Sequence, residues 1–205
     1  MKRNVGSWRV WLSRSLGTIA ASWRLWSFRL LVLVAAYLMV RSFIMPWWTA
    51  YIDHPVGGRV GEIEIYAYGL RHTLVQYASW LVNDETPFYQ TLLAWVYLAA
   101  SVGLTLYSTW LKGRKGQFLL GGIGLIYIAY AAIAVFVVIA NRTADFGISL
   151  QGWSPLMVEV EGVEDWVDIN ASLPFGSFLA YAAGGTTVVL ALLRGIIVGR
   201  PKLGT

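Results

Sequence analysis

Four long apolar runs constrain this chain more than any other feature of its sequence. They cover residues 25–45, 92–111, 118–140 and 175–198, and each has close to the roughly 20 residues that a helix needs to cross a bilayer. The chain is 57% hydrophobic and 13% charged, about half the charged fraction of an ordinary soluble domain. The runs predict an integral membrane protein, mainly α-helical, with a bundle of four transmembrane helices.

The charged residues predict how these helices are oriented. All eleven acidic residues fall at about 46–88 and 141–174, whereas twelve of the sixteen basic residues lie away from these two segments and a thirteenth, Arg41, lies at the edge of the first. Basic residues near the ends of membrane helices mark the cytoplasmic side. We therefore expect cytoplasmic N- and C-termini in the cell membrane, with both acidic segments outside. The net charge of +5 then needs no nucleic-acid partner.

Nine segments follow from these two patterns. The basic first segment is interpreted as an amphipathic helix on the inner leaflet or as a cytoplasmic extension of the first span. In chain order the segments are the basic amphipathic segment at 1–24, a span at 25–45, an outer loop at 46–91, a span at 92–111, a cytoplasmic hairpin at 112–117, a span at 118–140, an outer loop at 141–174, a span at 175–198 and a cytoplasmic tail at 199–205.

The two outer loops carry strand patterns. Residues 60–68 alternate apolar and polar side chains, which indicates a half-buried strand, and 73–82 is consistent with a helix or a strand. Residues 156–163 and 165–171 form a predicted hairpin in the second loop. A single hairpin is marginally stable in water. We therefore expect one small extracytoplasmic β-sheet that is built from both loops and packs on the bundle.

The chain contains no cysteine. Disulfides, thiolate metal sites and thiol nucleophiles are thereby excluded. An outer domain without disulfides is typical of prokaryotic proteins, so the sequence favours a prokaryotic source. No histidine lies in a predicted span, which argues against haem, and we expect no cofactor.

Small residues repeat along the fourth span. Such stripes allow helix backbones to approach closely in lipid. We interpret the stripe as packing within the four-helix bundle, and the alternative is a face for a second copy or another membrane protein. Its residues are Gly176, Ala180, Gly184, Thr187 and Ala191.

The chain has two histidines, His54 and His72, and Asp53 precedes the first. Imidazole and carboxylate groups together can bind a metal ion, but this spacing matches no known ligand motif. We interpret these residues as structural and predict no metal site. The sequence also lacks G-x-S-x-G, H-E-x-x-H and P-loop motifs, so we expect a protein that is not an enzyme.

Three further polar positions lie in or beside the predicted outer loops. Arg41 is expected to pair with a loop carboxylate such as Glu62 or Asp84, and the alternative is contact with an anionic lipid or ligand. Asn141 and Asn170 begin the N-x-S/T sequons Asn-Arg-Thr and Asn-Ala-Ser. They are candidate glycosylation sites, consistent with an outward loop.

The plan of the chain resembles the claudin-like tetraspan proteins. The local similarity is Pro46-Trp47-Trp48, then a strand, then Tyr68-Gly69-Leu70. Claudins carry an early loop tryptophan, then Gly-Leu-Trp and two cysteines. Here Arg71 replaces the second tryptophan and the cysteines are missing. The similarity in architecture extends from the first span onward, and it implies a left-handed four-helix bundle under an outer sheet that contacts other proteins.

These patterns favour a non-enzymatic accessory or structural subunit, or an interaction scaffold, of a membrane or cell-envelope complex. Its partners would be the lipid bilayer and other membrane or envelope proteins, with further copies of itself as an alternative. Aromatic residues on the acidic outer cap are the expected interface anchors. They are Trp80, Trp153, Trp166 and Tyr66.

Two other classes of function stay open. A small oligomeric channel or transporter would need a pore between copies or a polar seam in the spans. A metal- or redox-associated subunit of a membrane enzyme would use His54 and His72. The residues available for a polar seam are Ser101, Thr105, Thr186 and Thr187.

Overall fold

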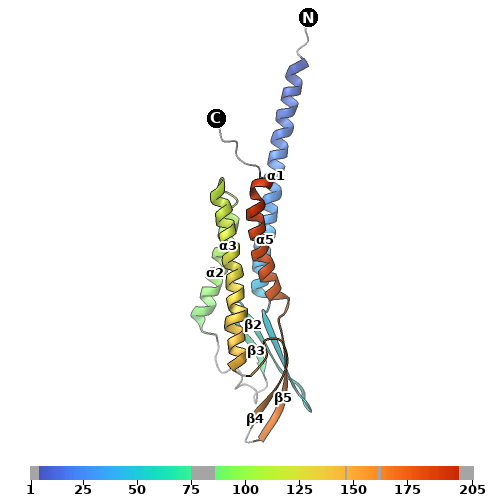
Figure 1. The fold of residues 1–205 in the computed structure, drawn as a ribbon, viewed down its shortest axis with the longest axis vertical. Helices are drawn as coiled ribbons and strands as arrows, with labels where there is room; N and C mark the ends of the chain where they lie inside the picture. The colour runs from blue at the N-terminus through green and yellow to red at the C-terminus, as the bar shows by residue number, and fades with distance from the viewer. Residues whose placement is uncertain (1–4, 75–85, 146, 161–162, 199–205) are drawn as a thin grey trace.

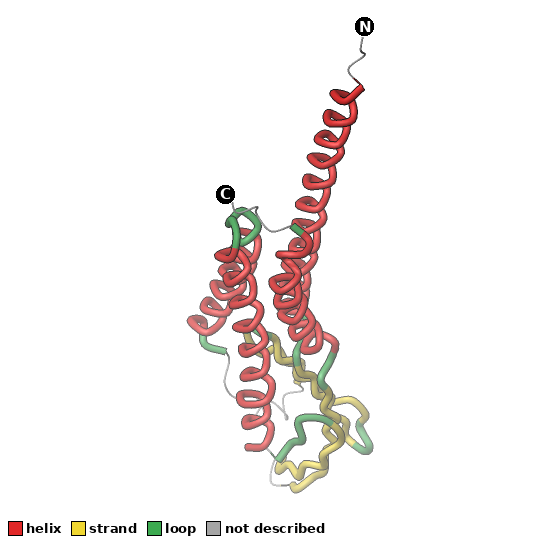
Figure 2. Tube along the Cα trace, turned by 45° about the horizontal axis from the view of Figure 1, so that its top comes forward, coloured by secondary structure: helices red, strands yellow, loops and turns green. Residues whose placement is uncertain are grey.

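A bundle of long helices with a sheet at one end forms the molecule (Figures 1 and 2). The computed structural model describes the backbone of residues 5–74, 86–145, 147–160 and 163–198, and the side chains of 22–73, 86–145, 147–157 and 165–198. The two ends of the described chain and the connection between the second and third helices lie at the end of the bundle opposite the sheet.

The predicted set of four membrane-capable helices is confirmed. Each contains a stretch long and apolar enough to cross a bilayer, by length and composition. The helices are α1 (Val5–Ile44), α2 (Phe88–Tyr107), α3 (Arg114–Ile133) with its continuation through the π-helix η2 (Ala134–Ile139) into α4 (Ala140–Asp145), and α5 (Phe175–Ile197).

Two helices are longer than the apolar runs alone indicate. Residues 5–24 continue α1 without a break, and this part of the helix projects beyond the rest of the bundle (Figure 1). The third helix does not end at residue 140, because η2 and α4 carry it to Asp145. Its 32 residues span about 48 Å at about 1.5 Å per residue. Since a bilayer core is about 30 Å thick, this helix is long enough to cross and still reach the sheet.

The predicted small sheet built from both loops is present, and it consists of five antiparallel strands. Its strand order is β3-β2-β1-β5-β4. The central pair β1–β5 joins segments more than 100 residues apart, from Thr49 opposite Ser172 to Asp53 opposite Asp168. The strands are β1 (Trp48–His54), β2 (Gly58–Tyr66), β3 (Gly69–Leu74), β4 (Gly152–Val160) and β5 (Val163–Ser172).

The sequence patterns misplaced some strand boundaries. The central strand β1 was not predicted, because Trp48 to Ala50 are all buried and the strand lacks apolar–polar alternation. The strand predicted at 60–68 ends at Tyr66, and a turn leads into β3 at Gly69. Gly69 has φ +152°, a backbone conformation that favours glycine. The predicted element at 73–82 extends beyond the described residues after Leu74.

Trp47 joins the bundle to the sheet. Its side chain is 1% exposed, its indole N–H donates to the carbonyl of Ser42 at 2.8 Å, and its backbone N–H donates to the carbonyl of Ile65 at 2.7 Å. The ring of Tyr130 of α3 packs edge-on against the Trp47 ring, with the ring centroids 5.8 Å apart. The Tyr130 hydroxyl donates to the carbonyl of Ala67 at 2.8 Å. The sheet is therefore fixed to α1 and α3 by paired polar groups as well as by apolar contact.

A buried stripe runs up the third helix to the inner face of the sheet. Ala131, Val135, Ile139 and Thr143 are buried at intervals of four residues. In an α-helix each such interval rotates the stripe by about 40°. The i→i+5 bonds of η2 wind the chain less tightly, so the stripe keeps facing the sheet. The inner-face residues it shares a core with include Ala50, Ile52, Ile63, Val167 and Ile169.

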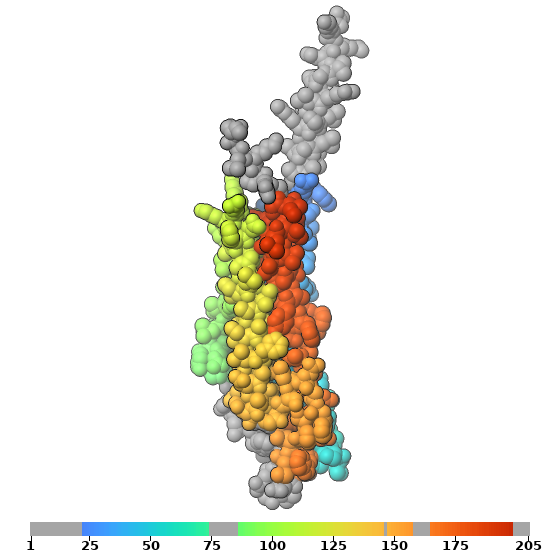
Figure 3. All heavy atoms as spheres, in the orientation of Figure 1, coloured from blue at the N-terminus to red at the C-terminus, as the bar shows by residue number. Residues whose placement is uncertain are grey.

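The small residues predicted to pack lie inside the bundle. Gly176, Ala180, Gly184, Thr187 and Ala191 are all buried, and α3 and α5 lie along one another while α2 occupies one side (Figure 3). Where α3 meets α5, a Cβ added to Gly184 would lie 2.8 Å from the carbonyl oxygen of Gly124. This face is therefore occupied within the monomer.

This close approach predicts opposite effects for neighbouring glycines. Gly124→Ala and Gly184→Ala each place a methyl group against backbone of the facing helix, and we expect a loss of about 1–3 kcal/mol of stability. Gly122→Ala and Gly185→Ala meet nothing within 4 Å and should be neutral or slightly stabilising, because alanine favours helix. Thermal unfolding in detergent measures all four, and equal effects would contradict the packing.

Candidate functional site

The register of the strands determines which residues lie on the face of the sheet that is turned away from the helices, which we call the outer face. Residues paired across an antiparallel ladder share a face, and successive residues alternate. Ile52 and Ile169 are paired and buried, so Tyr51 and Asn170, which are also paired, lie on the opposite, outer face. The same rule places the following residues on that face: Arg71 of β3, Glu62, Glu64 and Tyr66 of β2, Asp53 of β1, Trp166 and Asp168 of β5, and Trp153 and Met157 of β4.

One half of this face is a polar network on β1 and β2. The Tyr66 hydroxyl donates to Glu64 at 2.8 Å, and burial together with this bond raises the pKa of Tyr66 to about 12. The Glu62 carboxylate raises the pKa of Tyr51. Arg59 covers the Tyr51 ring at 4.1 Å. Both phenols therefore stay neutral and donate to the carboxylates near neutral pH.

The other half, which we call the β4–β5 patch, consists of Trp153, Met157, Trp166 and Asp168. Trp153, Met157 and Trp166 are 60%, 50% and 53% exposed, and Met157 lies directly opposite Trp166 in the register. Large apolar side chains exposed together on an ordered sheet mark an interaction surface. Aromatic residues of this kind contribute most to binding at protein interfaces.

The predicted interface residues are thus partly brought together. Trp153 and Trp166 share the β4–β5 patch, and Tyr66 lies on the same outer face but is half-buried and stacked on Tyr68, with ring centroids 5.1 Å apart. Trp80 lies outside the described residues. Met157 and Asp168 were not predicted, because their place beside Trp166 depends on the register of β4 against β5.

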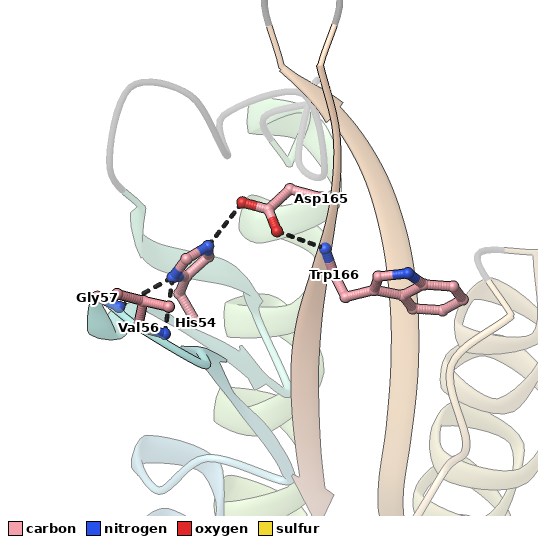
Figure 4. A network of polar contacts seen from close by, with 5 residues as sticks. All are labelled: His54, Val56, Gly57, Asp165 and Trp166. Atoms are coloured by element: carbon pink, nitrogen blue, oxygen red, sulfur yellow. Dashed lines mark hydrogen bonds and ion pairs between the residues drawn. The ribbon is translucent and has the colours of Figure 1, made fainter.

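His54 forms a link between β1 and β5 (Figure 4). Its Nε2 lies 2.7 Å from an Asp165 oxygen, and its Nδ1 accepts the backbone N–H groups of Val56 and Gly57 at 3.1 and 2.9 Å. Because Nδ1 accepts twice, the ring proton is assigned to Nε2, which donates to Asp165. Asp165 and Trp166 point to opposite sides of β5, so this link lies away from the β4–β5 patch.

The three weak metal candidates are not brought together. Both nitrogens of His54 already have partners, Asp53 lies 3.7 Å from Arg59, and His72 is exposed on β3. Within the described residues no group of three histidine, aspartate or glutamate side chains is placed to bind a metal ion. Because both ring nitrogens of His54 already have partners, we assign His54 a structural role in the turn between β1 and β2.

The remaining polar candidates lie at the surface. Arg41 is exposed near the end of α1, and no ion pair joins it to Glu62 or to another described carboxylate. Asp84 lies outside the described residues. Asn141 is exposed on α4 and Asn170 on β5, so both side chains are accessible, and glycosylation stays a prediction.

Three of the four hydroxyl groups proposed for a polar seam are buried in the helix packing. Thr105 and Thr187 are fully buried, and Thr187 donates to the carbonyl of Ala183 at 2.7 Å. Ser101 is buried and Thr186 is half-buried. Nearby, Ser42 and Tyr127 lie 2.8 Å apart and both donate to the carbonyl of Met39.

Arg194 is the one charged side chain that the described bundle buries. It is 8% exposed, donates to the carbonyls of Ser108 and Leu111, and covers the Phe28 ring at 5.2 Å. Its position near the helix end suggests a side chain that extends outward to water, but the Arg194 side chain does not do so. Instead it binds carbonyl groups at the end of α2, where a cation complements the helix dipole.

No family model and no curated protein sequence matches this chain. The fold defines a class by its geometry, namely four membrane-capable helices that carry a five-stranded antiparallel sheet. The resemblance to claudin-like proteins stays a prediction that rests on the plan of the chain.

The His54–Asp165 link predicts a pH-dependent stability. The His54 N–H and the Trp166 backbone N–H lower the pKa of Asp165. The native state then binds this proton less tightly than the unfolded state does, so the stabilisation is present above about pH 4 and is lost as pH falls through the lowered native pKa.

We therefore expect Asp165→Asn to lower the thermal midpoint near neutral pH, with a difference from wild type that shrinks below about pH 4. Asp145→Asn, an exposed carboxylate on α4, is the matched control and should show no such change. The measurement is thermal unfolding from pH 7 to pH 3, and a constant difference for Asp165→Asn would contradict the assignment.

Proposed function

We propose that this chain is a non-enzymatic integral membrane protein that serves as an accessory subunit or interaction scaffold of a membrane or envelope complex. The four helices would cross the membrane, with both termini in the cytoplasm and the sheet outside. The observation that carries the proposal is the β4–β5 patch, where three large apolar side chains are exposed on an ordered sheet. Such a surface is typical of a binding site for another protein.

Aromatic residues support a membrane position for the helices. Tyr89 and Tyr107 are exposed at the two ends of α2. They are 18 residues apart, about 27 Å along a helix, close to the thickness of a bilayer core. Trp26 of α1 and Trp110, which follows α2, are exposed. Both lie near the end of the bundle where α2 connects to α3. Exposed tyrosine and tryptophan at both ends of a helix fit the two membrane interfaces.

The charges support the proposed orientation. The connection between α2 and α3 and the first turn of α3 carry Lys112, Arg114 and Lys115, whereas seven of the eleven acidic residues lie in the strands. The sheet lies at the opposite end of the bundle from this connection (Figure 2). The positive-inside rule then assigns the sheet to the outer side.

Labelling of single cysteines tests the orientation, since the native chain has none. Val56→Cys lies in the turn before β2, where Val56 is 92% exposed, and should react in intact cells with a membrane-impermeant maleimide. Lys112→Cys, which is exposed between α2 and α3, should react only after the cells are permeabilised. The reverse pattern would place the sheet in the cytoplasm.

Isolation from native membranes tests the scaffold role. In a mild detergent the tagged full chain should migrate in a complex larger than its own 22.8 kDa plus detergent, with at least one other protein in a fixed ratio. A protein that stays strictly monomeric, with no other protein in a fixed ratio, would contradict the proposal. Ion flux through purified protein in liposomes would instead indicate a channel.

A further inference from the structure

We infer that the β4–β5 patch binds a cationic, partly apolar segment of a different protein. An apolar side chain of that segment would pack between Trp166 and Met157, and a lysine or arginine would pair with Asp168. This inference rests on the proposed function. The β4–β5 patch is the observation that carries that function, and the inference names the kind of partner that the patch binds.

An unfavourable charge pair points to a cationic partner. Asp53 and Asp168 are directly opposite in the register of β1 and β5, and like charges in this position destabilise a sheet. Arg59 lies 3.7 Å from Asp53, whereas Asp168 has no ion-pair partner among the described residues. A lysine or arginine of the partner would relieve the repulsion between Asp53 and Asp168. An apolar side chain of the same partner would contact Trp166 beside it.

The distance from the helices argues against lipid as the occupant. Trp166 lies six residues before Ser172, the last residue of β5, which is roughly 20 Å along a strand. The headgroup region extends only about 5–8 Å beyond the bilayer core. Figure 1 shows β4 and β5 extending away from the helices at this end of the molecule. Trp166 and Met157 therefore face the aqueous layer.

A second copy of this chain does not fit the charge pattern. Copies inserted in the same orientation present their acidic sheets on the same side, while the basic residues Lys112, Arg114 and Lys115 around the connection of α2 to α3 lie at the other end of the bundle. Two outer faces would then oppose like charges. A different protein with a basic surface is the occupant that electrostatic complementarity selects.

Pro155 indicates that the partner packs on the face of the sheet. β4 is an edge strand, and edge strands can bind a further strand through free backbone groups. Pro155 lies at the middle of β4, opposite Asp168, and offers no N–H to such a strand. The exposed side chains of the patch, rather than its edge, are left to make the contact.

Site-specific photocrosslinking in native membranes tests the inference. A benzophenone amino acid replaces Met157 in the full chain, and a second chain carries it at Thr73, which is exposed near the opposite edge of the same sheet. We expect the first chain to crosslink to one protein, at a segment with an excess of lysine and arginine. The second chain should not give this product.

Variants then test the named contacts. Trp166→Ala and Asp168→Asn should each reduce the yield of this crosslink by roughly tenfold, as truncation of a binding anchor does, and high salt should reduce it further. Trp110→Ala and Asp145→Asn, two exposed residues elsewhere, are the matched controls and should leave the yield unchanged. Thermal unfolding confirms that each variant is folded.

Several results would overturn the inference. These are a crosslink to a neutral or acidic segment, to lipid or to a second copy, no crosslink at position 157, or unchanged yields in Trp166→Ala and Asp168→Asn. If a larger complex is still isolated from membranes, only this inference fails and the proposed function stands. If no complex is isolated at all, both fail.

Discussion

The contact between the bundle and the sheet is the constraint on which the rest of this structure depends. Trp47 is buried at this contact with both its indole and its backbone N–H groups paired. The third helix continues through η2, whose Val135 and Ile139 share one core with the inner face of the sheet. Since buried donors without acceptors cost free energy, these paired groups favour one seating of the sheet. The outer face is thereby held in a fixed orientation to the helices.

A fixed sheet allows unfavourable features to persist on its outer face. Exposed Trp153 and Trp166 gain little from folding, and the opposed pair Asp53 and Asp168 costs free energy. The apolar inner face and the β1–β5 pairing offset these costs. On the polar half of the face, the carboxylates of Glu62 and Glu64 are paired with tyrosine hydroxyls. Asp168 has no ion-pair partner among the described residues. Residues that break the local rules of stability cluster where a protein meets its partner, which is why the β4–β5 patch carries the proposed function.

Several buried polar groups of the bundle are paired within it. The Ser42 and Tyr127 hydroxyls share one carbonyl, and Arg194 binds carbonyls at the end of α2. Such pairing is expected where water is scarce. The glycines at the contact of α3 with α5 allow the backbones to approach closely, so these two helices form a tight pair. α2 lies at the side of this pair (Figure 3). Its apolar residues Leu92, Leu93 and Val96 are exposed, as those of a helix in contact with lipid would be.

Much of this fold was predictable from local patterns, because helix spans and half-buried strands have periodicities of their own. Four apolar runs, breaker glycines and alternating strands sufficed for four helices under a sheet of two loops. The strand β1 was missed since its burial comes from neighbours on both sides. The charge segregation by itself determined which end of the bundle is acidic. Only the tertiary structure decided which acids and aromatics meet, because the register of β5 against β1 and β4 places Asp168 opposite Asp53, and Trp166 opposite Met157.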